Sequence, residues 1–186
     1  MPDLAWETLD STVAYACEGF DVLSQDVRLP DGTETDFDYL HEAESVVVLP
    51  FTPDDDVVVI EEWRQAVGRV NRGLPAGNLE AGETPADAAH RELAEETGHE
   101  AASVSHLTTV EPANGFADAV FHYFVARGCE PTAGQSLDAD ESIAVDVATF
   151  DDLLAAARDD ELRDGRAAFG VCYYALFGGD VDSLRE

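Results

Sequence analysis

The stretch GNLEAGETPADAAHRELAEETGH, residues 77–99, sets the expectations for the rest of the chain. Thr84 is a favourable helix N-cap, and the proline that follows it suits the first helical position. Asp87, three residues past the cap, completes a start that resembles a capping box. Gly98 can adopt the left-handed conformation that ends helices. The stretch therefore predicts a helix over about 85–97.

Three glutamates, Glu92, Glu95 and Glu96, would share one face of this helix, because positions i, i+3 and i+4 are neighbours on a helix surface. Arg91 can reach a carboxylate one turn away, most simply that of Glu95. Clustered carboxylates repel one another, and one would take up a proton unless a cation lay among them. Carboxylate oxygens suit magnesium or manganese, and magnesium binds through a few carboxylates together with substrate phosphate oxygens. The pattern therefore predicts a divalent-metal site and a polyphosphate ester as substrate.

The spacing of these residues is G-x5-E-x7-R-E-hydrophobic-x-E-E-x-G. An acidic, solvated helix face would explain any isolated pair of the glutamates. It does not explain the whole string, because seven positions set by identity match by chance about once in 10⁸ registers at average residue usage. The string resembles the signature of the Nudix hydrolases. One position departs from that family's pattern: His99 stands where a hydrophobic residue normally follows the last glycine, which affects packing more than chemistry.

The charge of the chain is extreme. It has 40 acidic and 10 basic residues and a net charge of −30, and every basic residue is arginine. A nucleic-acid-binding domain needs a basic surface, so nucleic acid is excluded as a partner. Concentrated salt screens such a charge within a few ångströms, so the composition favours a halophilic cytoplasm over the alternative, an acidic protein of a mesophile.

Cysteines and apolar runs indicate the compartment. Cys17, Cys129 and Cys172 are far apart and odd in number, so we expect small, buried or half-buried thiols in a reducing compartment. The longest apolar runs, 46–49 and 57–60, are far too short to span a bilayer, and the N-terminus does not resemble a signal peptide. The sequence predicts a soluble cytoplasmic protein without a membrane partner.

The chain is long enough for one full domain with a small appended element. Residues 1–42 contain short strand-like pieces and a turn at Pro30–Thr33, and they would bury little alone, so they must pack on the main domain or on a second subunit. In the main domain, 43–186, the apolar run 44–51 predicts a central strand. The last helix is expected over 166–177 and should stop at the following glycine pair.

More of the chain resembles the ADP-ribose pyrophosphatase branch of the Nudix family. The matching segments are LPDG (Leu29–Gly32), RQAVGR (Arg64–Arg69), LPAGNLEAGE (Leu74–Glu83), the Pro112–Asp118 loop and DADESI (Asp138–Ile143). The resemblance implies an α/β fold, the Nudix-type α/β/α sandwich with a mixed sheet, plus a small N-terminal antiparallel strand unit. It also implies hydrolysis of ADP-ribose to AMP and ribose 5-phosphate, with magnesium or manganese as cofactor, and a homodimer formed through an exchanged N-terminal sheet.

The resemblance also implies roles for single residues. Glu92 and Glu96 are the principal metal ligands, Glu95 shares the cluster, and the Ala76 carbonyl supplies a further ligand. Glu141 resembles a loop glutamate that assists metal binding or activates water; the alternative is one more acid in an acidic run. The base that removes a proton from the attacking water is therefore Glu95 or Glu141.

Substrate contacts follow from the flanking segments. Arg64 and Arg69 resemble positions that grip the substrate, although either could simply neutralise neighbouring acids. Arg91 joins the catalytic set as the residue that braces a carboxylate. Phe116 could stack on a nucleobase, and packing beside a turn is the alternative. Gly73 is a second departure, because the branch often has glutamate just before the LPAG turn.

Two other functions stay open. The first is a Nudix pyrophosphatase for a different small-molecule nucleotide: a nucleotide sugar, FAD, a dinucleoside polyphosphate or an oxidised nucleotide. The second is a sensor that binds ADP-ribose without cleaving it. Sensors usually have degraded signatures and a DNA-binding appendage, and neither feature is present in this sequence.

Overall fold

The computed structural model describes residues 4–139 and 141–183, and the chain divides into two compact units. Unit 1 consists of Met1–Glu44 and Val110–Val120, and unit 2 of Ser45–Thr109 and Phe121–Glu186. The predicted boundary lies after residue 42, which leaves the segment 110–120 in the main domain. The structure instead groups this segment with the N-terminal strands.

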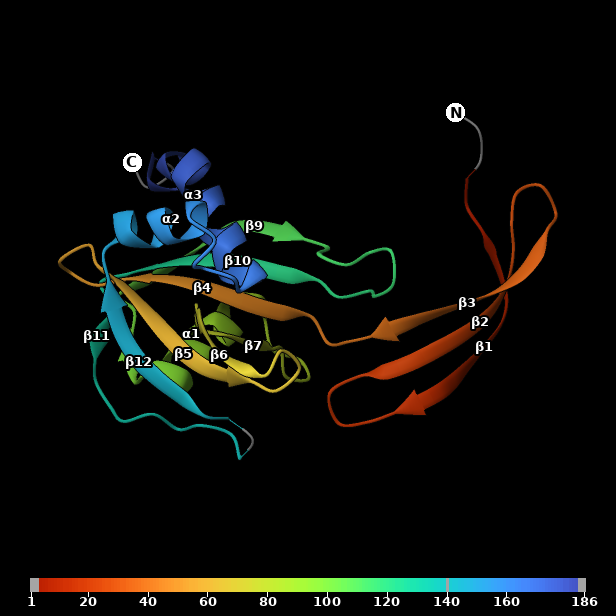
Figure 1. Ribbon diagram of the computed structural model, residues 1–186, viewed down its shortest axis with the longest axis horizontal. Helices are drawn as coiled ribbons and strands as arrows, with labels where there is room; N and C mark the ends of the chain where they lie inside the picture. The colour runs from red at the N-terminus through yellow and green to blue at the C-terminus, as the bar shows by residue number, and fades with distance from the viewer. Residues whose placement is uncertain (1–3, 140, 184–186) are drawn as a thin grey trace. The chain divides into compact units, whose positions relative to one another are not determined.

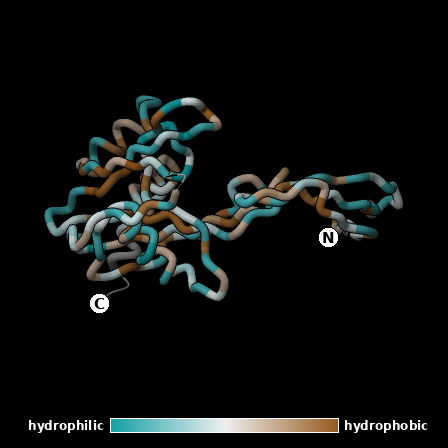
Figure 2. The backbone as a smooth tube through the Cα atoms, turned by 90° about the horizontal axis from the view of Figure 1, so that it is seen from below, coloured by the Kyte–Doolittle hydropathy of each residue, from teal (hydrophilic) through white to brown (hydrophobic). Residues whose placement is uncertain are grey.

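Unit 1 is built on an antiparallel sheet with the order β1-β2-β3 (Figure 1). Its strands are β1 (Glu7–Ala16), β2 (Asp21–Arg28) and β3 (Glu34–His41). The sequence indicates two separate strand-like pieces at 20–23 and 27–29, whereas the structure has one strand, β2, from Asp21 to Arg28. Every residue of β1 is exposed, and the hydropathy colours change repeatedly along these strands (Figure 2). The sheet therefore buries little by itself, as the sequence predicts.

The segment 110–120 belongs to unit 1 because it is bonded to β3. The Leu40 N–H donates to the Phe116 carbonyl at 2.9 Å, and the Asp118 N–H donates to the Leu40 carbonyl at 3.1 Å. His41 Nδ1 also lies 2.6 Å from Asp118 Oδ2, and this carboxylate raises the pKa of His41. These bonds connect the loop to the end of the strand.

Unit 2 contains a seven-stranded mixed sheet with the order β12-β5-β4-β10-β9, in which β6 pairs with β5 and β7 with β4. The strands are β4 (Ser45–Phe51), β5 (Val57–Arg64), β6 (Arg69–Gly73), β7 (Ala76–Asn78), β9 (Ser103–Val110), β10 (Phe121–Arg127) and β12 (Ile143–Ala148). The short strands β8 (His99–Glu100) and β11 (Glu130–Pro131) form a separate pair. β4 is parallel to β10 and antiparallel to β5 and β7. Every residue of β4 is buried, which confirms the predicted central strand.

Helices cover both faces of this sheet (Figure 1). Side chains alternate along β4, so Val46 and Val48 meet α1 (Pro85–Thr97) on one face. Phe51 meets Tyr174 on the other face, with ring centroids 5.1 Å apart. The helices there are α2 (Phe150–Arg158) and α3 (Gly165–Ser183). The fold is thus the α/β/α arrangement with a mixed sheet that the resemblance implied.

The end of α3 corrects one expectation. The helix does not stop at Gly178 and Gly179 but continues to Ser183. A Cβ atom at Gly178 would collide with the ring of Tyr174, one turn earlier. Gly178 therefore allows close packing inside the helix, and it does not end it.

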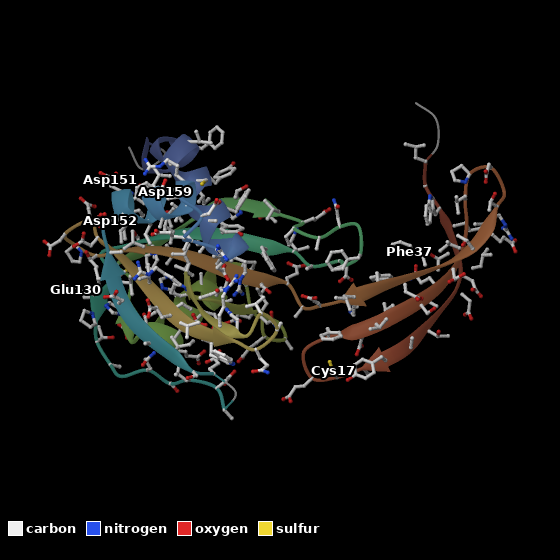
Figure 3. All side chains as sticks on the ribbon, in the orientation of Figure 1. Cys17, Phe37, Glu130, Asp151, Asp152 and Asp159 are labelled. Atoms are coloured by element: carbon white, nitrogen blue, oxygen red, sulfur yellow. The ribbon has the colours of Figure 1, made fainter. Side chains whose placement is uncertain are left out.

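The cysteines are free, and their burial was predicted correctly only for Cys129. Cys17, beside the turn that follows β1 (Figure 3), and Cys172 on α3 are exposed, so the prediction was wrong for these two. Within the described part of the chain, no helix is long and apolar enough to cross a membrane.

Candidate active site

The helix α1 begins and ends where its caps predict. The Thr84 hydroxyl accepts a hydrogen bond from the Asp87 N–H at 3.2 Å, which satisfies a free donor of the first turn. Gly98 has φ of 70°, the left-handed conformation, and its N–H bonds to the Ala94 carbonyl. Both caps fix the register of the glutamates that follow.

The glutamates of α1 are not equivalent. Glu92 and Glu96, one turn apart, are 8% and 2% exposed, whereas the side chain of Glu95 is 44% exposed. Glu96 Oε2 accepts a hydrogen bond from the Ala76 N–H at 3.0 Å, which ties the helix to β7. One face of the helix thus holds two buried carboxylates and one that reaches solvent.

Gly77 is required by the approach of β7 to this face. A Cβ atom at Gly77 would overlap the carboxylate of Glu92. Only glycine leaves room for the carboxylate beside the backbone, which explains why this residue belongs to the signature.

Arg91 binds most of the acids of the signature. Its guanidinium donates to both carboxylate oxygens of Glu83 at 2.9 Å, to Glu92 at 2.7 Å and to Glu95 at 3.0 Å. It also donates to the Asn78 carbonyl at 2.9 Å. The bonds to Glu83 contribute most to raising the pKa of Arg91, and they lower the pKa of Glu83. The predicted Arg91–Glu95 pair is confirmed as part of this larger network.

The surroundings of the two buried glutamates, Glu92 and Glu96, disfavour the ionised form of both carboxyl groups. Burial, opposed by the bond from the Ala76 N–H and reinforced by the neighbouring Glu92 and Glu141, raises the pKa of Glu96 to about 8. Burial also raises the pKa of Glu92, although Arg91 lowers it. A cation would relieve both groups.

The donor set has the chemistry of a magnesium or manganese site, since it offers carboxylate oxygens and a nearby backbone carbonyl. Among the described residues, no three His, Cys, Asp or Glu side chains already converge enough to hold a metal ion. Arg91 binds Glu92 and Glu95 in this arrangement. The fit therefore rests on the type and burial of the oxygens.

A cavity of about 460 Å³ in unit 2 brings most of the predicted site together. Its lining includes Arg64, Ala76, Arg91, Glu92, Glu95 and Glu141. Glu141 comes from the segment before β12, and its Oε2 accepts a hydrogen bond from the Asp138 N–H at 2.9 Å. Asp140, in the DADESI segment, lies outside the described residues.

Three residues singled out in the sequence lie elsewhere. Arg69 does not line the cavity, is exposed and donates to Asn71 Oδ1 at 2.7 Å. Phe116 belongs to unit 1, where it is 60% exposed and lines a separate hollow with Phe37 and other residues. His99 is buried in β8 with Nδ1 3.0 Å from the Thr97 carbonyl, so it has a packing role.

The lining residues that the sequence reasoning missed include two charged ones outside the quoted segments, Glu62 and Arg166. Glu62 lies on β5 and is only 9% exposed, and it alternates with exposed Glu61 and Trp63. The sequence did contain a signal for Glu62, because a glutamate at a position whose side chain faces the interior of an apolar strand is unusual. Arg166 stands in the first turn of α3, and nothing in the local sequence connects it to the cavity.

Fold and site together define an α/β domain with a carboxylate-lined cavity, and comparisons with known proteins give its family. A NUDIX domain matches residues 41–168. Over 177 residues the chain is 30% identical to the ADP-ribose pyrophosphatase of Bacillus subtilis (strain 168), with 95% of this chain and 96% of that protein covered. The chain is 33% identical over 154 residues to the methanol dehydrogenase activator of Bacillus methanolicus, with 81% and 82% covered.

A solved structure agrees on the fold. The crystal structure of an ADP compounds hydrolase superposes with a TM-score of 0.83 at 20% identity, covering 97% of this chain and 98% of the other. Because the domain match spans more than half of the chain, the protein belongs to the Nudix family.

Proposed function

We propose that the protein hydrolyses ADP-ribose to AMP and ribose 5-phosphate with magnesium or manganese as cofactor. The observation that carries this proposal is the cavity in which Arg91, Glu92 and Glu95 of the signature meet Arg64 and Glu141. The nearly full-length similarity to an ADP-ribose pyrophosphatase supports the choice of substrate.

The residues have distinct tasks in this reaction. Glu92, Glu96 and the Ala76 carbonyl would hold the metal, with Glu95 and Glu141 as further ligands. The bound metal supplies positive charge that offsets the charge of the diphosphate. Arg64, whose side chain is 33% exposed and lines the cavity, binds a phosphate group through its guanidinium.

The proton of the attacking water passes to Glu95 or Glu141, since both line the cavity. Glu95 is paired with Arg91, and Glu141 accepts a bond from the Asp138 N–H. The pH dependence of kcat for Glu95→Gln and Glu141→Gln separates the two. The variant without the base loses the acidic limb of the profile, and the other variant keeps it.

The substrate is tested by incubation of the protein with magnesium and ADP-ribose and separation of the products. AMP and ribose 5-phosphate in equal amounts are the expected result. A panel with a nucleotide sugar, FAD, a dinucleoside polyphosphate and an oxidised nucleotide tests the other pyrophosphatase functions. Binding of ADP-ribose without any turnover would instead identify a sensor.

The subunit arrangement belongs to the same proposal. Unit 1 exposes Trp6, Val13 and Tyr15 on or beside β1, and these apolar side chains fit a second copy of the chain in a homodimer. Sedimentation should give twice the mass of the chain, and Val13→Asp with Tyr15→Asp should give the monomer.

The setting of the protein is proposed to be a halophilic cytoplasm. The net charge of −30 destabilises a compact chain by self-repulsion, and concentrated salt screens it. The midpoint of thermal unfolding should therefore rise by about 10 °C or more between 0.1 M and 2 M potassium chloride. Equal midpoints in both solutions would contradict the halophilic setting.

A further inference from the structure

The cavity contains a buried carboxylate that the proposed mechanism does not use. Glu62 is nine-tenths buried, and its Oε2 atom has no hydrogen-bond partner among the described residues. Arg64 Nη2 lies 2.6 Å from this oxygen, within ion-pair distance but without the geometry of a hydrogen bond. A buried carboxylate oxygen without a well-placed donor is costly unless a ligand supplies one.

A second arginine reaches the same part of the cavity from the start of α3. Arg166 lines the cavity, and its Nη2 lies 3.6 Å from Asp164 Oδ2. Asp164 is held in place because its Oδ1 accepts a hydrogen bond from the Ala167 N–H at 2.9 Å. Arg166 is therefore carried by a capped helix start.

Gly73 provides the space for this helix start. A Cβ atom at Gly73 would lie 3.9 Å from Asp164 Cγ and 3.7 Å from Ile60 Cγ1, which are ordinary contacts. An alanine would fit there, but a longer side chain would take the place of Asp164. The second departure from the family pattern thus coincides with the entry of Arg166 into the cavity.

The charges around Glu62 define the ligand that would complement it. Arg64 and Arg166 act on Glu62 as positive neighbours, and Glu141 and Asp164 act as negative ones. Two guanidinium groups suit a phosphate, whereas the Glu62 oxygen requires hydrogen-bond donors. A second, terminal phosphate at this place would meet the carboxylate and be repelled. A phosphate that carries a hydroxyl-rich sugar offers both the anion and the donors.

We propose that Glu62, Arg64 and Arg166 form a sugar-phosphate subsite, in which Glu62 accepts hydrogen bonds from sugar hydroxyls and excludes a terminal phosphate. This inference rests on the proposed function and deepens it: the subsite selects nucleoside diphosphates linked to a sugar over nucleoside triphosphates. Glu62 is then a specificity residue, and Arg166 a further phosphate-binding residue.

The test compares ADP-ribose with ATP, which places a terminal phosphate where ADP-ribose has its second ribose. Glu62→Gln keeps the size of the side chain and removes its charge. It should lower kcat/KM for ADP-ribose about 10- to 100-fold and raise kcat/KM for ATP about 3- to 10-fold. Arg166→Gln should raise KM for ADP-ribose about 10-fold. Glu61→Gln, on the exposed face of the same strand, is the matched control and should leave both substrates within about 2-fold.

Opposite changes for the two substrates are the result that a purely structural role of Glu62 would not produce. Equal changes for both would overturn the subsite. A binding measurement separates this outcome from failure of the proposed function. Ribose 5-phosphate should bind the wild type more tightly than inorganic phosphate does, and Glu62→Gln should remove the difference. If the wild type does not hydrolyse ADP-ribose, the proposed function fails, and unchanged ribose 5-phosphate binding in the variant still decides against the subsite.

Discussion

The cavity has two ends with opposite construction. At the signature end, Arg91 stands among several acids and donates to Glu83, Glu92 and Glu95. At the β5 end, the buried carboxylate of Glu62 has Arg64 and Arg166 as positive neighbours, and its Oε2 has no hydrogen-bond partner among the described residues. The comparison teaches that side chains at the signature end satisfy one another through hydrogen bonds, whereas the β5 end keeps hydrogen-bonding capacity for the proposed ligand.

The largest expected effect concerns the signature end. Glu96→Gln should reduce metal-dependent turnover of ADP-ribose by about 10³-fold or more, because it removes a buried negative ligand where the metal is needed. The fold should persist, since the amide oxygen can still accept the bond from the Ala76 N–H. Steady-state kinetics with magnesium, together with circular dichroism of the variant, measure both. Turnover at the wild-type level would remove Glu96 from the metal site.

The same substitution should have the opposite effect on stability when metal is absent. Folding raises the pKa of Glu96 from 4.5 to about 8, so the unfolded chain ionises first as pH rises. The stabilising contribution of protonated Glu96 is therefore lost between pH 4.5 and pH 8, and it changes no further above pH 8. Glu96→Gln avoids this loss and should be more stable by roughly a few kcal/mol near pH 8. Urea unfolding in EDTA at pH 5 and pH 8 tests the difference.

Glu95 offers the control for that experiment, since its side chain is half exposed on the same helix. Glu95→Gln should lose only its contact with Arg91, without a gain that grows with pH. If Glu96→Gln and Glu95→Gln showed the same pH dependence, burial of Glu96 would not be its cause.

The backbone beside the signature end gives an intermediate effect. In Gly77→Ala the new methyl group overlaps the Glu92 carboxylate, which must move. We expect kcat/KM to fall about 10- to 100-fold through misplacement of a metal ligand. Gly134→Ala is the control, because a Cβ atom there meets nothing within 4 Å. A loss in the control as large as in Gly77→Ala would mean that the cause is not the contact with Glu92.

The two ends also differ in how far the sequence predicted them. The caps of α1 and the Arg91–Glu95 pair follow from spacings of three and four residues, which the helix itself enforces. Glu62 and Arg166 come from β5 and α3, about a hundred residues apart. Only the tertiary fold brings them together, so no local pattern could identify the pair.

Two further predictions failed for other reasons. At helical spacing, Ala86, Ala89 and Leu93 indicate an apolar stripe on α1, yet Ala86 is exposed and Ala88 is buried with Ala89 and Leu93. Each successive residue points about 100° further around a helix, and small side chains such as alanine do not show which face is buried. Cysteine is on average a buried residue, but β1 has no covered face and Cys17 follows it. Average burial cannot tell which elements remain uncovered.

The smallest expected effect sharpens the comparison at the β5 end. Gly73→Glu should displace Asp164 and with it the start of α3, because the longer side chain needs the space that Asp164 fills. We expect kcat/KM for ADP-ribose to fall about 3- to 10-fold as Arg166 moves. Gly73→Ala should change nothing, since its methyl group makes ordinary contacts. Gly73→Gln separates size from charge: the same loss as in Gly73→Glu supports displacement, whereas wild-type kinetics in Gly73→Gln would assign the loss to the added negative charge.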